Sequence, residues 1–159
     1  MAAGRSRRRY LIVIVAAVAL FAVLQGRVMA AMVMFSAVDG TITNNGVPVA
    51  GARVEREFLW SMKRETGTDS TVTDARGHFT LPVITRRSLM AIFPHEPVVR
   101  QSIVIQVGDT SYKAWMYFMR NYDDNGELGR PIRLTCRLET EPAKRPASYD
   151  SVFGVCELG

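Results

Sequence analysis

Residues 38–84 constrain the fold more than any other part of the chain. Two stretches within them, 52–60 and 79–83, alternate apolar and polar side chains with a period of two, as half-buried β-strands do. A turn-forming segment containing Gly with Pro or Asp precedes each stretch, at 46–51 and at 74–77. The pattern predicts strands joined by short turns.

Two later segments, 98–107 and 131–138, have the same period, and each has one apolar and one polar face. No long segment after the N-terminal region has a helical period, and Gly, Pro, Asn and Asp recur at short intervals. We therefore expect an all-β fold, a sandwich of about seven strands. The domain would occupy residues 31–140, with a polar loop at 62–69, and a C-terminal tail would follow at 141–159.

Residues 1–30 have the pattern of an export leader. Four arginines at 5–9 precede a purely apolar run at 10–24, and the residues up to Ala30 suit a cleavage site. Because the run is shorter than the ~20 residues that span a bilayer, we favour a signal peptide that is cleaved after Ala30. The alternative is an uncleaved anchor helix, since residues 28–35 are again apolar and could lengthen a span. Either leader predicts a periplasmic protein, attached to the inner membrane in the anchored case.

Residues 6–11, SRRRYL, also resemble a twin-arginine export signal. The apolar run behind them is more hydrophobic than such signals usually are. An arginine cluster is more often the ordinary positive segment of a signal peptide. The sequence therefore leaves the export route open.

The positive charge of the chain is confined to the leader. The whole sequence has 20 Lys and Arg against 15 Asp and Glu. Five of the basic residues precede residue 31, which leaves 15 residues of each sign in the exported part. Basic and acidic residues are also interleaved there, as at 53–57. A nucleic-acid-binding surface gathers its basic residues into a patch, so we do not expect nucleic acid as a partner.

Cys136 and Cys156 are the only cysteines, and both lie in the exported part. In an oxidising compartment, a disulfide is the simplest expectation for such a pair. The bond would close a loop of about 20 residues and add about 3 kcal/mol by restricting the unfolded chain. Two free thiols are the alternative, and a metal site would need further ligands that the sequence does not place nearby.

Residues 111–120 are apolar on both faces, with Trp115 and Tyr117 on the same one. A sandwich strand buries only one face in its own core, so the other face must be covered by the tail, by a loop or by another molecule. Burial under the tail is one interpretation of Trp115 and Tyr117, and of Trp60. The other is an exposed binding face, because aromatic residues are enriched at the hot spots of protein interfaces.

Residues 121–127 form a predicted turn that contains Tyr122, Asp123 and Asp124. Their side chains do not follow the alternating ligand spacing of an EF-hand, so a solvated acidic turn is favoured over a calcium loop. The same turn could present its carboxylates to a basic partner. Tyr122, Asp123 and Asp124 are therefore candidate partner-binding residues, together with the three aromatic residues above.

The sequence contains no catalytic constellation. Its only histidines are His78, expected to point outward at the start of a strand, and His95, expected in a loop. No nucleophile elbow, phosphate loop or metal-binding helix motif accompanies them. We expect no enzyme activity, no cofactor and no metal site.

The segments GTITNNGVPVAGARV and TVTDARGHFTLP resemble the carboxypeptidase regulatory-like domain family, which has a transthyretin-like fold. The resemblance covers roughly residues 37–84 and implies a transthyretin-like β-sandwich. In that family the motif concerns turns and strand packing, which implies structural roles for Gly46, Gly51, Asp74 and Gly77.

The remainder of the chain, with YKAWMYF, NYDDNGELG, LTCRL and a terminal GVC, is similar to short uncharacterised proteobacterial proteins with the same N-terminal motif. Some members of that group are assigned as immunity proteins of type VI secretion toxin loci. This resemblance implies a stoichiometric inhibitor in the periplasm whose partner is a secreted bacterial toxin, and it carries no catalytic residue over.

The transthyretin-like family also has an enzymatic branch, the hydroxyisourate hydrolases, which use histidines, an arginine and a characteristic C-terminal tetrapeptide. Residues 155–159, VCELG, lack that tetrapeptide. We therefore expect a non-enzymatic protein-binding domain. The alternative is a structural or carbohydrate-binding module of the cell envelope, which would expose a planar row of aromatic side chains.

Overall fold

The computed structural model of the chain describes residues 14–16, 31–88 and 94–159. Residues 14–16 are helical, and the rest of the predicted leader lies outside the described residues. Within the described ranges, no helix is both long enough and apolar enough to cross a membrane. Residues 32–86 and 95–159 make up one compact unit.

The described residues contain thirteen β-strands, which confirms the expectation of an all-β fold. There are more strands than expected, because several are short and the C-terminal tail contributes three. The strands are β1 (Ala31–Phe35), β2 (Val38–Asn44), β3 (Val47–Pro48), β4 (Arg53–Trp60), β5 (Glu65–Val72), β6 (His78–Leu81), β7 (Ile84–Arg87), β8 (Val99–Val107), β9 (Thr110–Met119), β10 (Ile132–Arg137), β11 (Ala143–Pro146), β12 (Ser151–Gly154) and β13 (Cys156–Leu158).

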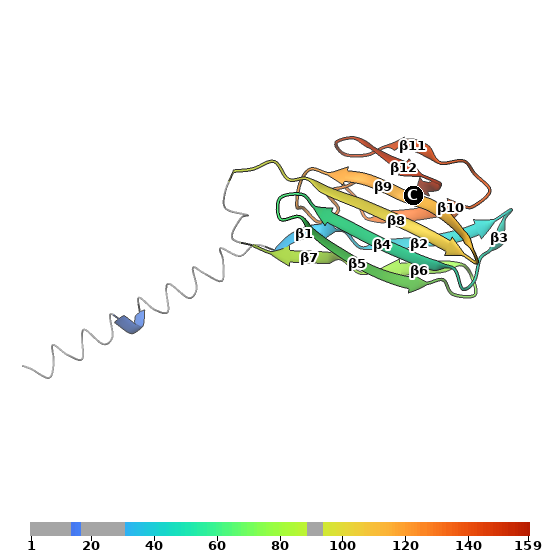
Figure 1. The fold of residues 1–159 in the computed structure, drawn as a ribbon, viewed down its shortest axis with the longest axis horizontal. Helices are drawn as coiled ribbons and strands as arrows, with labels where there is room; N and C mark the ends of the chain where they lie inside the picture. Colours follow the sequence, from blue (N-terminus) through green and yellow to red (C-terminus); the bar gives the residue numbers. More distant parts are fainter. Residues whose placement is uncertain (1–13, 17–30, 89–93) are drawn as a thin grey trace, which may run out of the picture. The chain divides into compact units, whose positions relative to one another are not determined.

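The strands form three sheets (Figure 1). One sheet has six strands in the order β11-β12-β9-β8-β4-β5. A second has five strands, in the order β13-β10-β2-β3 with β6 also paired to β2, and β1 pairs with β7 in a separate two-stranded sheet. In the two larger sheets, neighbouring strands are antiparallel except β2 and β10, which run parallel with Val38 opposite Ile132.

The two larger sheets face each other across an apolar core, in a sandwich-like arrangement (Figure 1). The predicted alternation is confirmed on β4 and β10, where every second residue is buried. Phe58, Ile103 and Trp115 enter the core from the six-stranded sheet, and Ile42 and Leu134 enter it from the five-stranded sheet. The period of two in the sequence thus corresponds to strands that bury one face.

The expectation of a polar loop at 62–69 is wrong for most of that segment. The turn covers residues 61–64, and β5 begins at Glu65 and pairs with β4 along all eight of its residues. A strand can tolerate this many polar residues because β5 is the last strand of its sheet and none of its residues is fully buried. Position at the sheet edge therefore outweighs composition here.

The predicted turn at 74–77 is closed by the side chain of Asp74. Its Oδ1 accepts hydrogen bonds from the backbone N–H groups of Arg76, at 2.8 Å, and His78, at 2.9 Å. Gly77 has a φ of +72°, and a side chain there would collide with the carbonyl oxygen of Ile42. The turn therefore requires its glycine, and it leads directly into β6.

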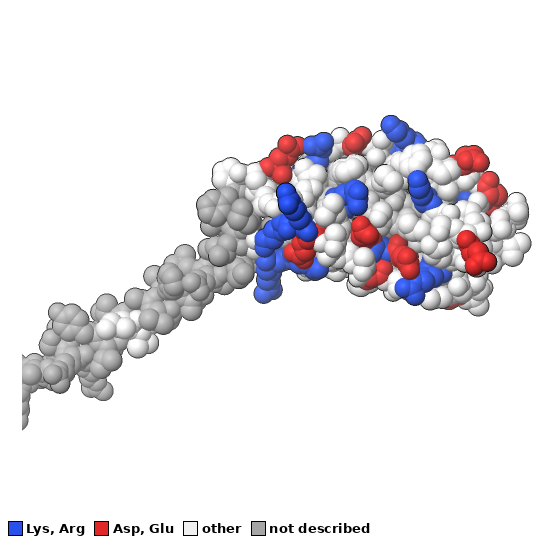
Figure 2. Space-filling model, in the orientation of Figure 1, with Lys and Arg blue, Asp and Glu red and all other residues white. Residues whose placement is uncertain are grey.

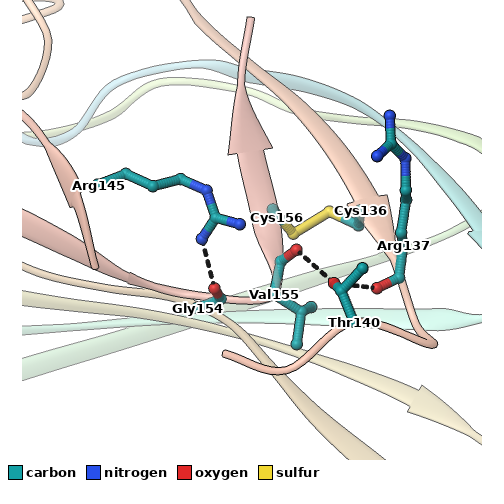
Figure 3. The surroundings of a disulfide bond; sticks show 7 residues. All are labelled: Cys136, Arg137, Thr140, Arg145, Gly154, Val155 and Cys156. Carbon is teal, nitrogen blue, oxygen red and sulfur yellow. Dashed lines mark hydrogen bonds between the residues drawn. A yellow bond between two sulfur atoms is a disulfide. The ribbon is translucent and has the colours of Figure 1, made fainter. Parts of the chain in front are cut away.

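The C-terminal tail belongs to both larger sheets. β12 pairs with β9 in the six-stranded sheet, and β13 pairs with β10 in the five-stranded sheet. At the crossing, a side chain on Gly154 would collide with the backbone of Ala114, so glycine permits the close approach. The predicted disulfide is present, because Cys136 and Cys156 lie directly opposite each other on β10 and β13 (Figure 3).

Candidate functional site: the loop end of the six-stranded sheet

Three loops lie at the same end of the six-stranded sheet. Trp60, the last residue of β4, is paired with Val99 at the start of β8. Val99 is in turn paired with Met119 at the end of β9. The turn after β4, the segment before β8 and the loop after β9 therefore meet. We call this region the loop end, and it comprises residues 61–64, 95–98 and 120–131.

The interpretation of the aromatic residues as an exposed binding face is wrong. Trp60, Trp115 and Tyr117 are at most 1% exposed. Trp115 packs on Phe35 of β1, with ring centroids 6.1 Å apart. A register shift after Ile103 lets β9 keep Trp115 and Tyr117 on the core side of the sheet. These side chains are part of the folded core and cannot anchor a partner.

Tyr122 joins the parts of the loop end. Its hydroxyl oxygen accepts a hydrogen bond from Trp60 Nε1 at 2.8 Å and lies 3.0 Å from His95 Nε2. An indole N–H can only donate, so Tyr122 is the acceptor in the bond with Trp60, while the tautomer of His95 sets the direction of the second bond. Burial raises the pKa of Tyr122, and the bond from Trp60 opposes that shift. The backbone carbonyl of Tyr122 also accepts the N–H of Val33 at 3.0 Å, which ties the loop to β1.

Glu127 fixes the same loop from the inside. Its carboxylate is fully buried. Oε1 accepts hydrogen bonds from the backbone N–H of Ser36, at 3.0 Å, and from Gln101 Nε2, at 2.7 Å, while Oε2 accepts the Ser36 hydroxyl at 2.6 Å. The Ser36 hydroxyl oxygen accepts the N–H of Asn125 at 2.8 Å. Within the described part of the chain, no ion pair involves Glu127.

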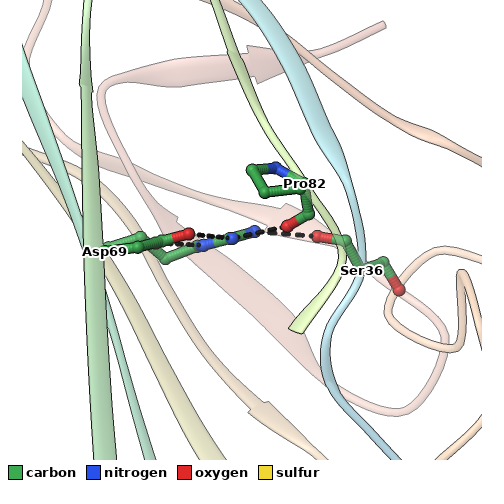
Figure 4. A network of polar contacts seen from close by, with 4 residues as sticks. Ser36, Asp69 and Pro82 are labelled. Carbon is green, nitrogen blue, oxygen red and sulfur yellow. Dashed lines mark hydrogen bonds and ion pairs between the residues drawn. The ribbon is translucent and has the colours of Figure 1, made fainter. Parts of the chain in front are cut away.

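Buried Arg56 is the centre of a second polar cluster, which includes Asp69, Ser36 and Pro82 (Figure 4). Its Nε and Nη2 donate to the two carboxylate oxygens of Asp69, at 2.9 and 2.6 Å. Its Nη1 donates to the carbonyl oxygen of Ser36 at 3.1 Å, and its Nη2 donates also to that of Pro82. Ser36 therefore takes part in both clusters, through its carbonyl in one and through its N–H and hydroxyl in the other.

Asp123 and Asp124 are exposed on the outer side of the loop. The loop is closed by its own side chains, because Asn121 accepts the N–H of Asp123 at 3.1 Å and donates to the carbonyl of Gly126 at 3.2 Å. Both carboxylates line an open hollow of about 530 Å³, together with Arg130 and the exposed ring of Tyr149. Of the six candidate residues, these two are the ones that a partner can reach freely.

The outer face of the six-stranded sheet has a mixed character. Arg53 lies 2.6 Å from Glu55, and Arg100 lies 3.6 Å from Glu57. Phe118 is 42% exposed on the same sheet. On the face in view in Figure 2, basic side chains are interspersed with acidic ones rather than gathered by sign. Exposed pairs of this kind contribute little to stability, and they give this surface no strong field of one sign.

The histidines occupy two separate contacts. His78 Nε2 lies 2.9 Å from Asp39 on the five-stranded sheet, and His95 contacts Tyr122 at the loop end. In the residues that the structure describes, no group of three His, Cys, Asp or Glu side chains is placed to hold a metal ion. The loop end offers exposed carboxylates, held on a rigid support, that can accept hydrogen bonds and pair with cationic groups.

Sequence reasoning missed the residues that make the loop rigid: Ser36, Arg56, Gln101 and Glu127. Two of them had a readable signal, because Arg56 and Gln101 occupy inward positions of strands whose other inward residues are apolar. A charged or amide side chain at an inward position of a strand indicates a buried polar partner. Ser36 and Glu127 lie outside any alternating pattern and had no such signal.

The fold and the loop end define an all-β, disulfide-bonded domain that presents a fixed loop with two exposed carboxylates. The family described as Domain of unknown function (DUF6795) matches residues 38–141, more than half of the chain, and the chain belongs to that family. The match extends from β2 to β10 and stops before β11, so the tail strands lie outside it. No curated protein and no solved structure matches the chain.

Proposed function

We propose that the chain is an exported, non-enzymatic domain that binds a partner protein through its loop end. The observation that carries the proposal is the fixed loop 120–131, in which buried Glu127 holds the backbone while Asp123 and Asp124 face outward. A loop that is already ordered loses little conformational entropy on association. Exposed carboxylates favour a basic partner surface and speed the encounter with it.

The tail adds to the support of this loop. The N–H of Ser148 donates to the carbonyl of Glu127 at 2.9 Å, so the segment between β11 and β12 is bonded to the loop. The tail is itself linked to β10 by the disulfide. Both sheets and the tail therefore support one short surface segment, as a binding site requires.

The specific role that we propose is immunity. The domain would neutralise a type VI secretion toxin in the periplasm by covering the toxin's active site. Support comes from the similarity of residues 112–156 to short envelope proteins of that kind and from the disulfide, which suits an oxidising compartment. We also propose that the two-sheet arrangement is transthyretin-like, as the strand and turn motif of residues 40–82 indicates.

The alternative, a carbohydrate-binding module of the envelope, has weaker support. Such a site needs a planar aromatic platform that the ligand can reach. Trp60, Trp115 and Tyr117 are the residues from which the sequence would build it, and they are buried.

The test is capture of partners by the tagged full chain from the periplasm under non-reducing conditions. The proposal expects a one-to-one complex with a basic protein, which is lost in the Asp123→Asn/Asp124→Asn variant. Asp109→Asn is the matched control, since Asp109 is an exposed acid in the β8–β9 turn at the opposite end of the sheet. Recovery of cell-wall material only, or equal capture by all variants, would contradict the proposal.

The immunity role has a separate readout. If a toxin gene lies beside the gene of this chain, a cell that expresses that toxin should survive when it also exports the wild-type chain. The Asp123→Asn/Asp124→Asn variant should fail to protect, while Asp109→Asn should protect as well as wild type. Binding without protection would contradict the immunity role but would leave the proposed protein-binding function standing.

A further inference from the structure

β1 is the first strand after the expected leader, and it is part of the core. Met32, Met34 and Phe35 are almost fully buried. Phe35 packs on Trp115, and the carbonyl of Met34 accepts a hydrogen bond from Gln101 Nε2 at 2.9 Å. Burial of an apolar side chain of this size stabilises a fold by ~1.5–3 kcal/mol. The domain therefore cannot complete its core until β1 is in place.

β1 begins at Ala31, directly after the expected cleavage position. A residue that is paired in a strand cannot at the same time lie extended in the active site of a peptidase. Nor can residues 32–35 continue a membrane span while their side chains fill the core of the domain. Folding therefore competes for the same residues with processing of the leader and with any lengthened anchor.

The disulfide gives an independent constraint on the order of events. Cys136 and Cys156 are 0% and 1% exposed. Closing the bond removes two electrons and two protons from the two thiols, and the disulfide of an oxidising thiol oxidoreductase is reduced to a dithiol in exchange. One thiolate first attacks the oxidant, and the second then displaces it. Burial of both sulfur atoms in the folded domain prevents that contact.

The compartment in which the disulfide forms therefore determines where the domain folds. In a reducing compartment the two cysteines would remain thiols. A domain that folded there would bury Cys136 and Cys156 before any oxidant reached them. The chain that carries the closed bond is therefore a chain that reached the oxidising side with these residues still accessible.

We infer that the chain crosses the membrane unfolded, by the general secretory route, and folds only after export. Processing of the leader frees β1 to dock, and the disulfide closes as β13 pairs with β10. The twin-arginine route carries folded proteins, so Arg7 and Arg8 serve only as the positive segment of the leader. This inference rests on the proposed export of the chain, and it adds the route and the order of the steps.

The experiment is a pulse-chase of the full chain in bacterial cells, with thiol alkylation and protease treatment at each time point. The expected order is a processed, reduced and protease-sensitive chain first, and an oxidised, protease-resistant chain later. Azide, which inhibits the ATPase of the general secretory route, should block export, and the Arg7→Lys/Arg8→Lys variant should be exported at the wild-type rate. A protease-resistant precursor inside the cell, or loss of export in the double-lysine variant, would overturn the inference.

Phe35→Ala provides a second arm that does not depend on the leader. If folding follows export, this core variant is exported at the wild-type rate, and only its protease resistance is delayed or lost. If the domain folds first, the variant loses export together with folding. Absence of export by either route would also overturn the inference. Twin-arginine export with intact capture of a partner would overturn it and leave the proposed binding function standing.

Discussion

Ser36 takes part in two buried polar clusters that are stabilised in different ways. In the first, the guanidinium of Arg56 meets the carboxylate of Asp69 in a two-pronged contact. In the second, the carboxylate of Glu127 receives all of its described hydrogen bonds from uncharged donors on Ser36 and Gln101. A buried charge costs several kcal/mol unless it is paired or fully hydrogen-bonded. The first cluster depends on charge pairing, and the second on hydrogen bonds alone.

The two clusters also differ in what they connect. Arg56 links β4 to β5 through Asp69. It also links β4 to Ser36, which lies just before β2, and to Pro82, which follows β6. Glu127 links a surface loop to the end of β1. Cooperative elements unfold together, while a loop can open on its own. Damage to the Arg56 cluster should therefore unfold the domain, and damage to the Glu127 cluster should loosen the loop end.

The largest effect is expected from Arg56→Ala. The variant leaves Asp69 without its cation and the carbonyls of Ser36 and Pro82 without a donor. The Asp69 side chain is 30% exposed and regains contact with water, so the loss comes mainly from the two carbonyls, at about 1–3 kcal/mol for each unpartnered acceptor, and urea denaturation would measure it. Arg53→Ala is the control, since Arg53 is on the same strand in an exposed pair with Glu55, and it should change little. Equal losses in the two variants would remove the distinction between buried and exposed pairs.

Glu127→Gln tests the cluster without a paired cation. The amide keeps the shape of the side chain, but its NH₂ group would face the donors on Ser36 or Gln101. Loss of hydrogen bonds to a buried charged group costs about 1.5–3 kcal/mol. Amide hydrogen exchange should become faster in residues 120–131 and stay slow in β4 and β8. Exposed Glu141→Gln is the matched control, and faster exchange throughout the domain would show that the loop is not a separate unit.

Tyr122→Phe tests the outer attachment of the same loop. It removes the acceptor of the Trp60 indole N–H and the contact with His95, while the ring remains. An unpartnered buried donor costs about 1–3 kcal/mol. The indole N–H resonance of Trp60 should shift, and that of Trp115, whose Nε1 has no hydrogen-bond partner among the described residues, should stay in place. An unchanged Trp60 resonance would contradict the assigned bond.

The smallest effect is expected at Asp74, the exposed counterpart of Glu127. Hydrogen bonds from the backbone N–H groups of His78 and then Arg76 hold the pKa of Asp74 below its usual 3.8. Because the folded-state pKa is the lower one, the carboxylate stabilises the fold above about pH 4, and this contribution is lost as the pH falls through the folded-state value. Asp74→Asn should therefore flatten the acid limb of a stability–pH curve. An acid limb as steep as that of the wild type would show that the turn contributes nothing.

The parts of the fold that sequence reasoning found are those that local pattern controls. β4 and β10 alternate because one face of each is buried, and a period of two is visible without knowledge of the partner strand. β5 was missed because an edge strand with both faces partly exposed has no such contrast. The tail strands were missed because pairing with distant strands, rather than composition, gives β11, β12 and β13 their place.

The candidate site shows the same limit at the level of single residues. Asp123 and Glu127 are carboxylates in one loop, yet the first faces solvent and the second is buried. The choice is made by Ser36 and Gln101, which lie 91 and 26 residues away in the chain. No local signal can report partners at that separation. The sequence likewise left Trp115 and Tyr117 either buried or exposed. Both faces of β9 are apolar, so its pattern does not show which face enters the core.

The parallel pairing of β2 and β10 has a consequence for synthesis of the chain. Val38 of β2 lies opposite Ile132 of β10, so the edge of β2 that does not pair with β3 and β6 must wait for 94 further residues before its partner exists. Pairings of such long sequence separation form late and slowly. Until then, one edge of β2 can pair with the strands of other chains. Stalled or truncated chains that end before residue 132 would therefore be an aggregation hazard to the cell that makes them.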